Sequence, residues 1–308
     1  MRVSSLVGLV MLLAATPASG QVFRAGVEMV SLGVTVADKG GALVSGLTPD
    51  DFVVMEDGVR QDVRLFVDGQ TSNGERPPLH IGLLFDTSGS MEMDLSMART
   101  AAIRFCNVLS RAEDITLVDF DTEVRVAQFG QNDFPRFVER LRSRKPDGWT
   151  ALYDALGVYL DGTAFQDGEK VVVVYTDGGD TRSVMSFKDA ITGLKAADAT
   201  VYVVGFLANQ RGRGGMEQRL RLTQLADATG GMAFFPSSQQ DIDAAYAQVL
   251  EEVNARYTLG YVSTNTREDG GWRQVDVRLN RPDLKSAKIR TRKGYYSLLR
   301  DARVGAQP

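Results

Sequence analysis

Hydroxyl and carboxylate side chains gather at three separated places in the chain. The three segments read "DTSGS" at residues 86–90, "WTALYDAL" at residues 149–156 and "TDGGD" at residues 176–180. The side chains in them that could bind a metal ion are those of Asp86, Ser88, Ser90, Thr150 and Asp177. All five offer oxygen, and oxygen ligands suit Mg²⁺, Mn²⁺ or Ca²⁺ better than zinc or copper. If the segments converge, the sequence predicts a divalent-cation site.

This ligand set also predicts how the ion would react. Mg²⁺ takes six oxygen ligands and keeps several waters when a protein supplies few of them. Three of the five candidate ligands are neutral hydroxyls, so an ion held mainly by hydroxyls and water stays electron-poor. Such an ion can accept one further anionic oxygen from outside. No residue of the set is predicted to act as a catalytic nucleophile or base, so we expect no enzyme.

The three segments lie in a region that alternates strands and helices. Residues 79–86 ("LHIGLLFD") and 170–177 ("KVVVVYTD") are near-continuous apolar runs, which are typical of strands covered by helices on both faces. Residues 114–129 predict a two-stranded hairpin, and residues 200–206 and 232–236 predict two further strands. Helical patterns occupy residues 95–109, 134–141, 151–160, 187–198, 216–230 and 240–257. The last is preceded by a capping pair of Ser238 and Asp241.

The middle of the chain is therefore predicted to be α/β, with an open, doubly wound, mostly parallel sheet and helices on both faces. In such sheets ligands bind beyond the carboxyl ends of the strands, where the winding direction reverses. The segments "DTSGS" and "TDGGD" each end a strand. We expect them to be neighbours at that point.

The two ends of the chain are β-rich. Residues 26–66 alternate apolar and polar residues and are broken by "DKGG", "TPDD" and "EDG", which predicts about four short strands. Residues 272–280 and 286–299 alternate in the same way. Neither end is sufficient alone, so both are expected to form one small β-sandwich-like domain into which the α/β domain is inserted. The expected organisation is a signal peptide at 1–20, β-rich halves at 21–75 and 255–299, the α/β domain at 76–254 and a polar tail at 300–308.

The first 20 residues predict export. They contain one arginine, an apolar run over residues 6–15 and small residues before Gln21, which is the pattern of a cleaved secretory signal peptide. No later stretch reaches the roughly 20 apolar residues of a membrane-spanning helix. We therefore expect a secreted protein without a membrane span, in the periplasm, at the cell surface or outside the cell.

Cys106 is the only cysteine, so no internal disulfide is expected, and its helical context predicts a small buried apolar residue.

Charge is unevenly distributed along the chain. The net charge is −4, and removal of residues 1–20 makes it −5 because Arg2 is lost. Residues 256–303 contain 12 basic and 5 acidic residues, a local excess of +7. These charges alternate with apolar residues, as on the solvated face of a strand, so we expect no nucleic-acid partner. The sequence does not indicate an oligomeric state.

The candidate ligands resemble the metal-ion-dependent adhesion site of von Willebrand factor type A domains. Asp86-x-Ser88-x-Ser90, the threonine of "WTALYDAL" and the aspartate of "YTDGGD" occur in the right order, each after the expected element, and the resemblance covers residues 77–250. It implies that Ser88, Ser90 and Thr150 contact the metal and that Asp86 and Asp177 reach it through water. It also implies that an Asp or Glu of a partner protein fills the open position, and that "DTSGS" lies beside "TDGGD".

The flanking segments have a finer resemblance. Residues 32–63, 257–261 and 272–297 are similar to the ends of secreted bacterial proteins grouped as the VWFA-related acidobacterial domain family. That family has no assigned biochemical role, so the resemblance bears on domain boundaries more than on function. Asp119, in "LVDFDTEV", is unusual for the family. It is predicted to be a solvated residue at the sheet edge rather than an additional cation ligand.

Other functions fit the residues less well. A hydrolase needs a base, but the only histidine, His80, starts the strand that Asp86 ends, roughly 20 Å away, and no Gly-x-Ser-x-Gly elbow surrounds Ser88. Mg²⁺-dependent phosphoryl transfer through Asp86 usually needs a second acid two residues on, where this chain has a serine. A structural metal that holds the α/β domain against the β-rich one is a further alternative. The segment "RGRGG" at 211–215 lacks the preceding strand of a nucleotide loop and is predicted to be a flexible loop.

Overall fold

The computed structural model describes residues 29–70, 76–108, 111–208, 210 and 212–299. The expected signal peptide and polar tail lie outside the described residues. Across the described ranges, no helix combines the length and the apolar character that crossing a membrane requires.

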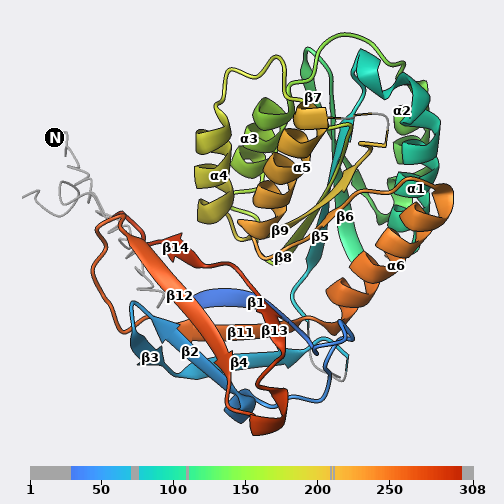
Figure 1. The fold of residues 1–308 in the computed structure, drawn as a ribbon. Helices are drawn as coiled ribbons and strands as arrows, with labels where there is room; N and C mark the ends of the chain where they lie inside the picture. Colours follow the sequence, from blue (N-terminus) through green and yellow to red (C-terminus); the bar gives the residue numbers. More distant parts are fainter. Residues whose placement is uncertain (1–28, 71–75, 109–110, 209, 211, 300–308) are drawn as a thin grey trace, which may run out of the picture.

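A central sheet of six strands confirms the predicted α/β fold (Figure 1). Its order is β10-β9-β8-β5-β6-β7, and all neighbours are parallel except β6 and β7, which form the predicted hairpin. The strands are β5 (Leu79–Asp86), β6 (Ala112–Phe120), β7 (Val124–Gly130), β8 (Glu169–Thr176), β9 (Ala199–Gly205) and β10 (Ala233–Phe234). Since β5 pairs with β8, the segments that follow these two strands are neighbours, as predicted.

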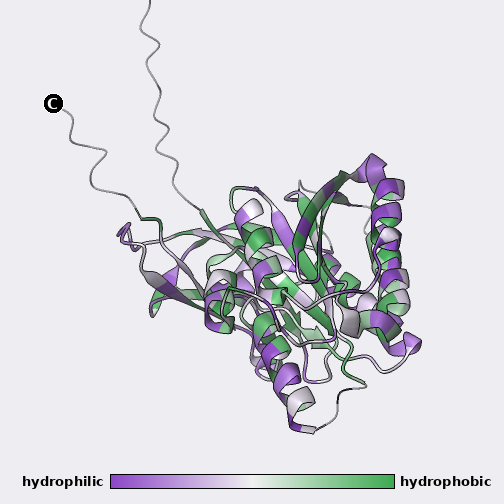
Figure 2. Cartoon of the chain, turned by 90° about the horizontal axis from the view of Figure 1, so that it is seen from above, coloured by the Kyte–Doolittle hydropathy of each residue, from purple (hydrophilic) through white to green (hydrophobic). Residues whose placement is uncertain are grey.

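Helices cover both faces of this sheet. On one face pack α1 (Leu95–Val108), α2 (Phe134–Ser143) and α6 (Gln239–Ala255), and on the other α3 (Leu152–Gly162), α4 (Phe187–Ala196) and α5 (Gly212–Asp227). The sequence dictates this arrangement because every residue of β5 is buried, with Phe85 in one core and Leu84 in the other. Figure 2 shows the apolar strands between helices that carry both apolar and polar residues. Gly82 allows α3 to approach closely, because a Cβ there would lie 2.4 Å from the Tyr159 ring.

The two chain ends together build a pair of smaller sheets below the α/β layers (Figure 1). Their orders are β13-β1-β11-β4 and β14-β12-β2-β3, so each sheet contains strands from both ends of the chain. One apolar core lies between them, with Leu32 and Val54 from the first end and Tyr257 and Val275 from the second. The strands are β1 (Met29–Ala37), β2 (Phe52–Glu56), β3 (Val59–Gln61), β4 (Val63–Asp68), β11 (Tyr257–Val262), β12 (Trp272–Leu279), β13 (Lys288–Arg290) and β14 (Gly294–Tyr296). The prediction that each end completes the other is confirmed.

One local prediction was wrong. Residues 212–215 of the expected flexible loop form the start of α5. Glycine is suited to this place because a Cβ on Gly215 would lie 2.4 Å from the carbonyl oxygen of Gln210, so only a bare backbone fits. Residues 286–299, which were predicted to be β-rich, contain two short strands in different sheets, because β13 pairs with β1 and β14 with β12.

Candidate metal centre

Asp86 occupies the carboxyl end of β5 and is fully buried. Its Oδ1 accepts a hydrogen bond from the Ser88 backbone N–H (2.9 Å), and its Oδ2 accepts one from the Thr176 hydroxyl (2.6 Å). Thr176 was not among the site residues predicted from the sequence. The register could have indicated it, because Phe85 lies opposite Tyr175 and the next residues of the two strands therefore meet.

Three further candidate ligands join Asp86 in one connected set. The Oγ atoms of Ser88 and Ser90 lie 3.1 Å apart, and Ser90 lies close enough to the Asp177 carboxylate to lower the pKa of Asp177, against the larger effect of burial, which raises it. Ser88 precedes the short 3₁₀ helix Gly89–Met93, which turns the chain away from β5 toward α1. Hydrogen bonds thus connect Asp86, Ser88 and Ser90, and Asp177 lies beside them at the end of β8.

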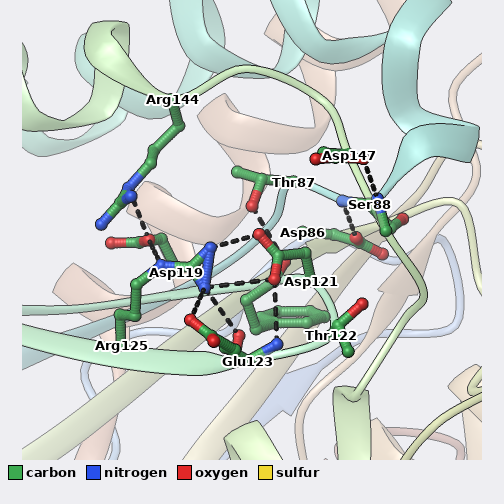
Figure 3. A network of polar contacts seen from close by, with 12 residues as sticks. Asp86, Thr87, Ser88, Asp119, Asp121, Thr122, Glu123, Arg125, Arg144 and Asp147 are labelled. Atoms are coloured by element: carbon green, nitrogen blue, oxygen red, sulfur yellow. Dashed lines mark hydrogen bonds and ion pairs between the residues drawn. The ribbon is translucent and has the colours of Figure 1, made fainter.

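The fifth candidate, Thr150, reaches the same edge through the backbone of its loop. The Gly89 N–H donates to the carbonyl of Gly148 (3.1 Å), and the Asp147 N–H donates to the carbonyl of Thr87 (2.9 Å), as Figure 3 shows in part. Gly148 has a φ of 69°, and a Cβ there would lie 2.4 Å from Oγ1 of Thr122. A glycine is therefore required where the loop passes closest to the β6–β7 turn.

The loop after β8 closes on Thr150 from the other side. The N–H groups of Thr181 and Arg182 donate to the Thr150 carbonyl (2.9 and 3.0 Å), and the Thr150 N–H donates to the Thr181 hydroxyl (3.0 Å). Asp180 accepts from the Tyr153 N–H at the start of α3 (3.0 Å). The Thr150 side chain is buried between these loops. Three segments far apart in sequence therefore form one interlocked edge.

The two carboxylates of the set, those of Asp86 and Asp177, are buried. Burial raises the pKa of Asp86 to about 7. It also raises the pKa of Asp177, and the negative charge of Asp94 adds to this effect. Within the described ranges, neither carboxylate forms an ion pair with a Lys, Arg or His. Buried charge without a partner is unfavourable, so a cation at this place would stabilise both ionised groups.

The donor set fits a hard divalent cation. In the part of the chain that the structure describes, no group of three or more His, Cys, Asp or Glu side chains is placed to hold a metal. The candidate set contains only two carboxylates, and its other three members are hydroxyls. Oxygen donors with few charges favour Mg²⁺, Mn²⁺ or Ca²⁺ over softer metals.

Asp119 was predicted to be a solvated edge residue, and this prediction was wrong. The residue is fully buried and forms ion pairs with Arg144 (Oδ2 to Nε, 2.8 Å), Arg140 (Oδ1 to Nη2, 2.9 Å) and Arg125 (Oδ2 to Nε, 3.3 Å) (Figure 3). The side chain projects to the face covered by α2, which supplies Arg140 and is followed by Arg144. All these partners are basic, so Asp119 is not available as a cation ligand. It anchors the start of the loop that carries Thr150.

The remaining reactive side chains lie away from this edge. His80 is the second residue of β5 and Asp86 the last, so the prediction that they lie at opposite ends of the strand is confirmed. The His80 Nδ1 lies 3.1 Å from the Asp114 carboxylate, and its Nε2 lies 2.9 Å from the Asp167 carbonyl. Cys106 is buried in α1, as predicted, and burial raises the pKa of its thiol well above the usual range.

The family model described as von Willebrand factor type A domain matches residues 80–248, more than half of the chain. No curated protein matches the chain. Among solved structures, the PilB minor pilin from Streptococcus sanguinis aligns with a TM-score of 0.48 and 15% identity, over 60% of this chain and 63% of that one, which is less than two thirds of the pilin. The conserved hypothetical protein BatB from Bacteroides thetaiotaomicron aligns with a TM-score of 0.46 and 16% identity, over 56% of this chain and 98% of that one. A von Willebrand factor type A protein from Catenulispora acidiphila aligns with a TM-score of 0.48 and 12% identity, over 93% of this chain and 78% of that one.

Proposed function

Because the chain belongs to the von Willebrand factor type A domain family, we propose that its sheet edge binds a divalent cation and, through it, an Asp or Glu carboxylate of a partner protein. The ion would be Mg²⁺, Mn²⁺ or Ca²⁺. One observation carries this proposal: Asp86 and Asp177 are buried where three interlocked loops meet, and no basic residue of the described chain pairs with either.

The roles within the site follow from the chemistry of the donors. The hydroxyls of Ser88, Ser90 and Thr150 would contact the ion, while Asp86 and Asp177 would supply charge through bound water. When bound, the ion would attract one further anionic oxygen as a ligand. Thr176 and the Ser88 N–H hold Asp86 in place, because each donates to one of its carboxylate oxygens. We propose that this binding takes place outside the cytoplasm, because residues 1–20 have the pattern of a secretory leader.

Two alternatives receive less support from the geometry. A metal that holds the α/β layers against the β-rich sheets would have to lie between them. Contacts between the two parts instead involve the amino ends of the strands, as in the hydrogen bond from Thr258 to Glu169 (3.3 Å). Phosphoryl transfer through Asp86 would need an accessible carboxylate, whereas Asp86 is fully buried with both oxygens hydrogen bonded.

Calorimetric titration with Mg²⁺ and Mn²⁺ tests the ligand assignment. We expect Ser88→Ala, Thr150→Ala and Asp177→Ala to weaken binding by roughly 10- to 100-fold or more, since even residues behind metal ligands have effects of that size. Thr100→Ala, an exposed hydroxyl on α1, is the matched control and should bind like the wild type. Equal affinity in all four variants would show that the ligands are wrongly assigned.

A pull-down from envelope extract, in Mg²⁺ and then in EDTA, identifies partners. Proteins retained only in Mg²⁺ are candidates, and Thr150→Ala should fail to retain them. If the same proteins bind in EDTA, the ion does not mediate their binding.

A further inference from the structure

Large apolar side chains stand exposed on each of the three loops of the metal centre. The side chains of Val184, Met93 and Trp149 are 96%, 81% and 64% exposed, respectively. Trp149 immediately precedes Thr150, and Met93 ends the 3₁₀ helix that contains Ser90. The backbone bond from Gly89 to Gly148 keeps the segments of Met93 and Trp149 together. The centre is thus bordered by apolar groups that the fold itself does not bury.

The backbone beneath these side chains is held in place. The Trp149 N–H donates to the Thr122 hydroxyl (2.9 Å), and the Val184 N–H donates to the Asp154 carboxylate (2.9 Å). Apolar groups held in water on a fixed backbone are typical of interaction surfaces, and a surface that is already ordered loses less conformational entropy when a partner binds.

The same border is strongly acidic. Residues 86–94, 121–125, 144–150 and 177–184 together contain eight acidic and four basic residues, a net charge of −4. Two of the four basic residues are already paired with carboxylates: Arg144 with the buried Asp119, and Arg125 with Asp119, Asp121 and Glu123. Glu92, Glu123 and Asp147 are exposed. A bound divalent cation would leave this border at −2, so it would attract one carboxylate at its centre while disfavouring further acids beside it.

We propose that the partner segment is basic around a single Asp or Glu and carries a large apolar residue next to it. The single carboxylate would bind the ion, the apolar residue would pack against Trp149 and Met93, and Lys or Arg residues would face Glu92, Glu123 and Asp147. This inference rests on the proposed function and adds the chemistry of the partner to it. Charge complementarity favours a basic segment of another protein, because an acidic anchor with acidic neighbours would meet a border with a net negative charge.

Four synthetic peptides test this inference by fluorescence anisotropy in Mg²⁺. The first has a central Glu flanked by Lys and Leu residues, and the others replace Lys by Asp, Leu by Ser, or the central Glu by Gln. We expect the Lys-flanked peptide to bind about tenfold or more tightly than the Asp-flanked one, an effect typical of charge complementarity. The preference should shrink when NaCl is raised from about 0.1 M to about 1 M, which shortens the Debye length from about 10 Å to about 3 Å.

Protein variants locate the effect on the border. Trp149→Ala should weaken the Lys-flanked peptide about tenfold, as for a central aromatic contact residue, and should leave the Mg²⁺ affinity of the protein alone unchanged. The double variant Glu92→Lys, Glu123→Lys should reverse the charge preference. Leu220→Ala, which removes an equally exposed apolar side chain from α5, is the matched control and should change nothing.

The outcomes separate this inference from the proposed function. If the protein binds Mg²⁺ but prefers the Asp-flanked peptide, or shows no preference, the inference is wrong and the metal site stands. If the Gln peptide binds as well as the Glu peptide in Mg²⁺, the carboxylate role itself fails. A Mg²⁺-dependent dimer in sedimentation velocity that excludes the peptides would identify a second copy of the chain as the occupant, against the inference.

Discussion

Replacement of Asp119 by asparagine should destabilise the fold strongly, although the residue is neither a metal ligand nor part of the exposed border. The change removes a fully buried negative charge from three guanidinium groups, those of Arg125, Arg140 and Arg144. Removal of one partner from a buried ion pair costs about 3–5 kcal/mol, because the other charge is left unpaired. The three arginine side chains are 24%, 33% and 26% exposed and can partly rehydrate, so we expect the lower end of that range, about 3 kcal/mol.

Urea unfolding followed by circular dichroism, in EDTA, measures this difference without a contribution from bound metal. Asp276→Asn is the matched control, because Asp276 pairs with Arg278 at 2.6 Å but both side chains are exposed (45% and 71%). An exposed pair contributes about 0–1 kcal/mol. Should Asp119→Asn lose no more free energy of unfolding than Asp276→Asn, the reasoning that burial makes the Asp119 cluster important is refuted.

Two further outcomes are expected. Burial raises the pKa of Asp86 in the folded chain to about 7, above its ordinary value of 3.8. Between these two values the metal-free folded state therefore binds more protons than the unfolded state. Its stability should fall as the pH rises from about 4 to about 7, by up to roughly 4 kcal/mol. Thermal unfolding in EDTA at both ends of this pH range measures the loss of stability, and a stability that rises with pH would contradict the prediction. Asp86→Asn should make the stability less dependent on pH. Gly148→Ala should lower both stability and Mg²⁺ affinity, because the new Cβ would lie 2.4 Å from Oγ1 of Thr122 at a positive φ. Gly46→Ala is the control, because Gly46 has a φ of 73° and a Cβ there would meet nothing within 4 Å. It should lower the free energy of unfolding by only about 1 kcal/mol, from backbone strain, and leave Mg²⁺ affinity intact. Equal losses of Mg²⁺ affinity in the two variants would contradict the inference that Gly148 positions the loop of Thr150.

The parts of the fold that the sequence predicted are those fixed by local pattern. The apolar runs that became β5 and β8, and the Ser238 cap of α6, depend on residues near one another in the chain. The expectation that the segments after β5 and β8 lie side by side came from a general rule of open sheets, and the pairing of these strands confirms it.

The parts that the sequence did not predict depend on tertiary contacts. Asp119 sits next to a turn and in an alternating strand, which locally indicates a solvated residue. Its burial results from α2 covering that face and from Arg144, 25 positions away in the chain, turning back to meet it. Thr176 likewise looks like an ordinary strand residue until the register puts it against Asp86.

The polar residues at the two ends of the central sheet form different kinds of contact. At the amino ends of the strands, the buried Arg256 donates hydrogen bonds to the hydroxyls of Thr200 and Tyr202 (2.9 Å each). Tyr202 in turn donates to the buried Glu252 (3.1 Å). Glu252 also forms an ion pair with Arg290 of β13. Separating the β-rich sheets from the α/β layers would leave these buried groups unpaired, which is strongly unfavourable. The carboxylates at the opposite edge have no such protein cation, within the described residues. A partner bound through a cation at that edge would therefore be held in a fixed orientation relative to the β-rich sheets.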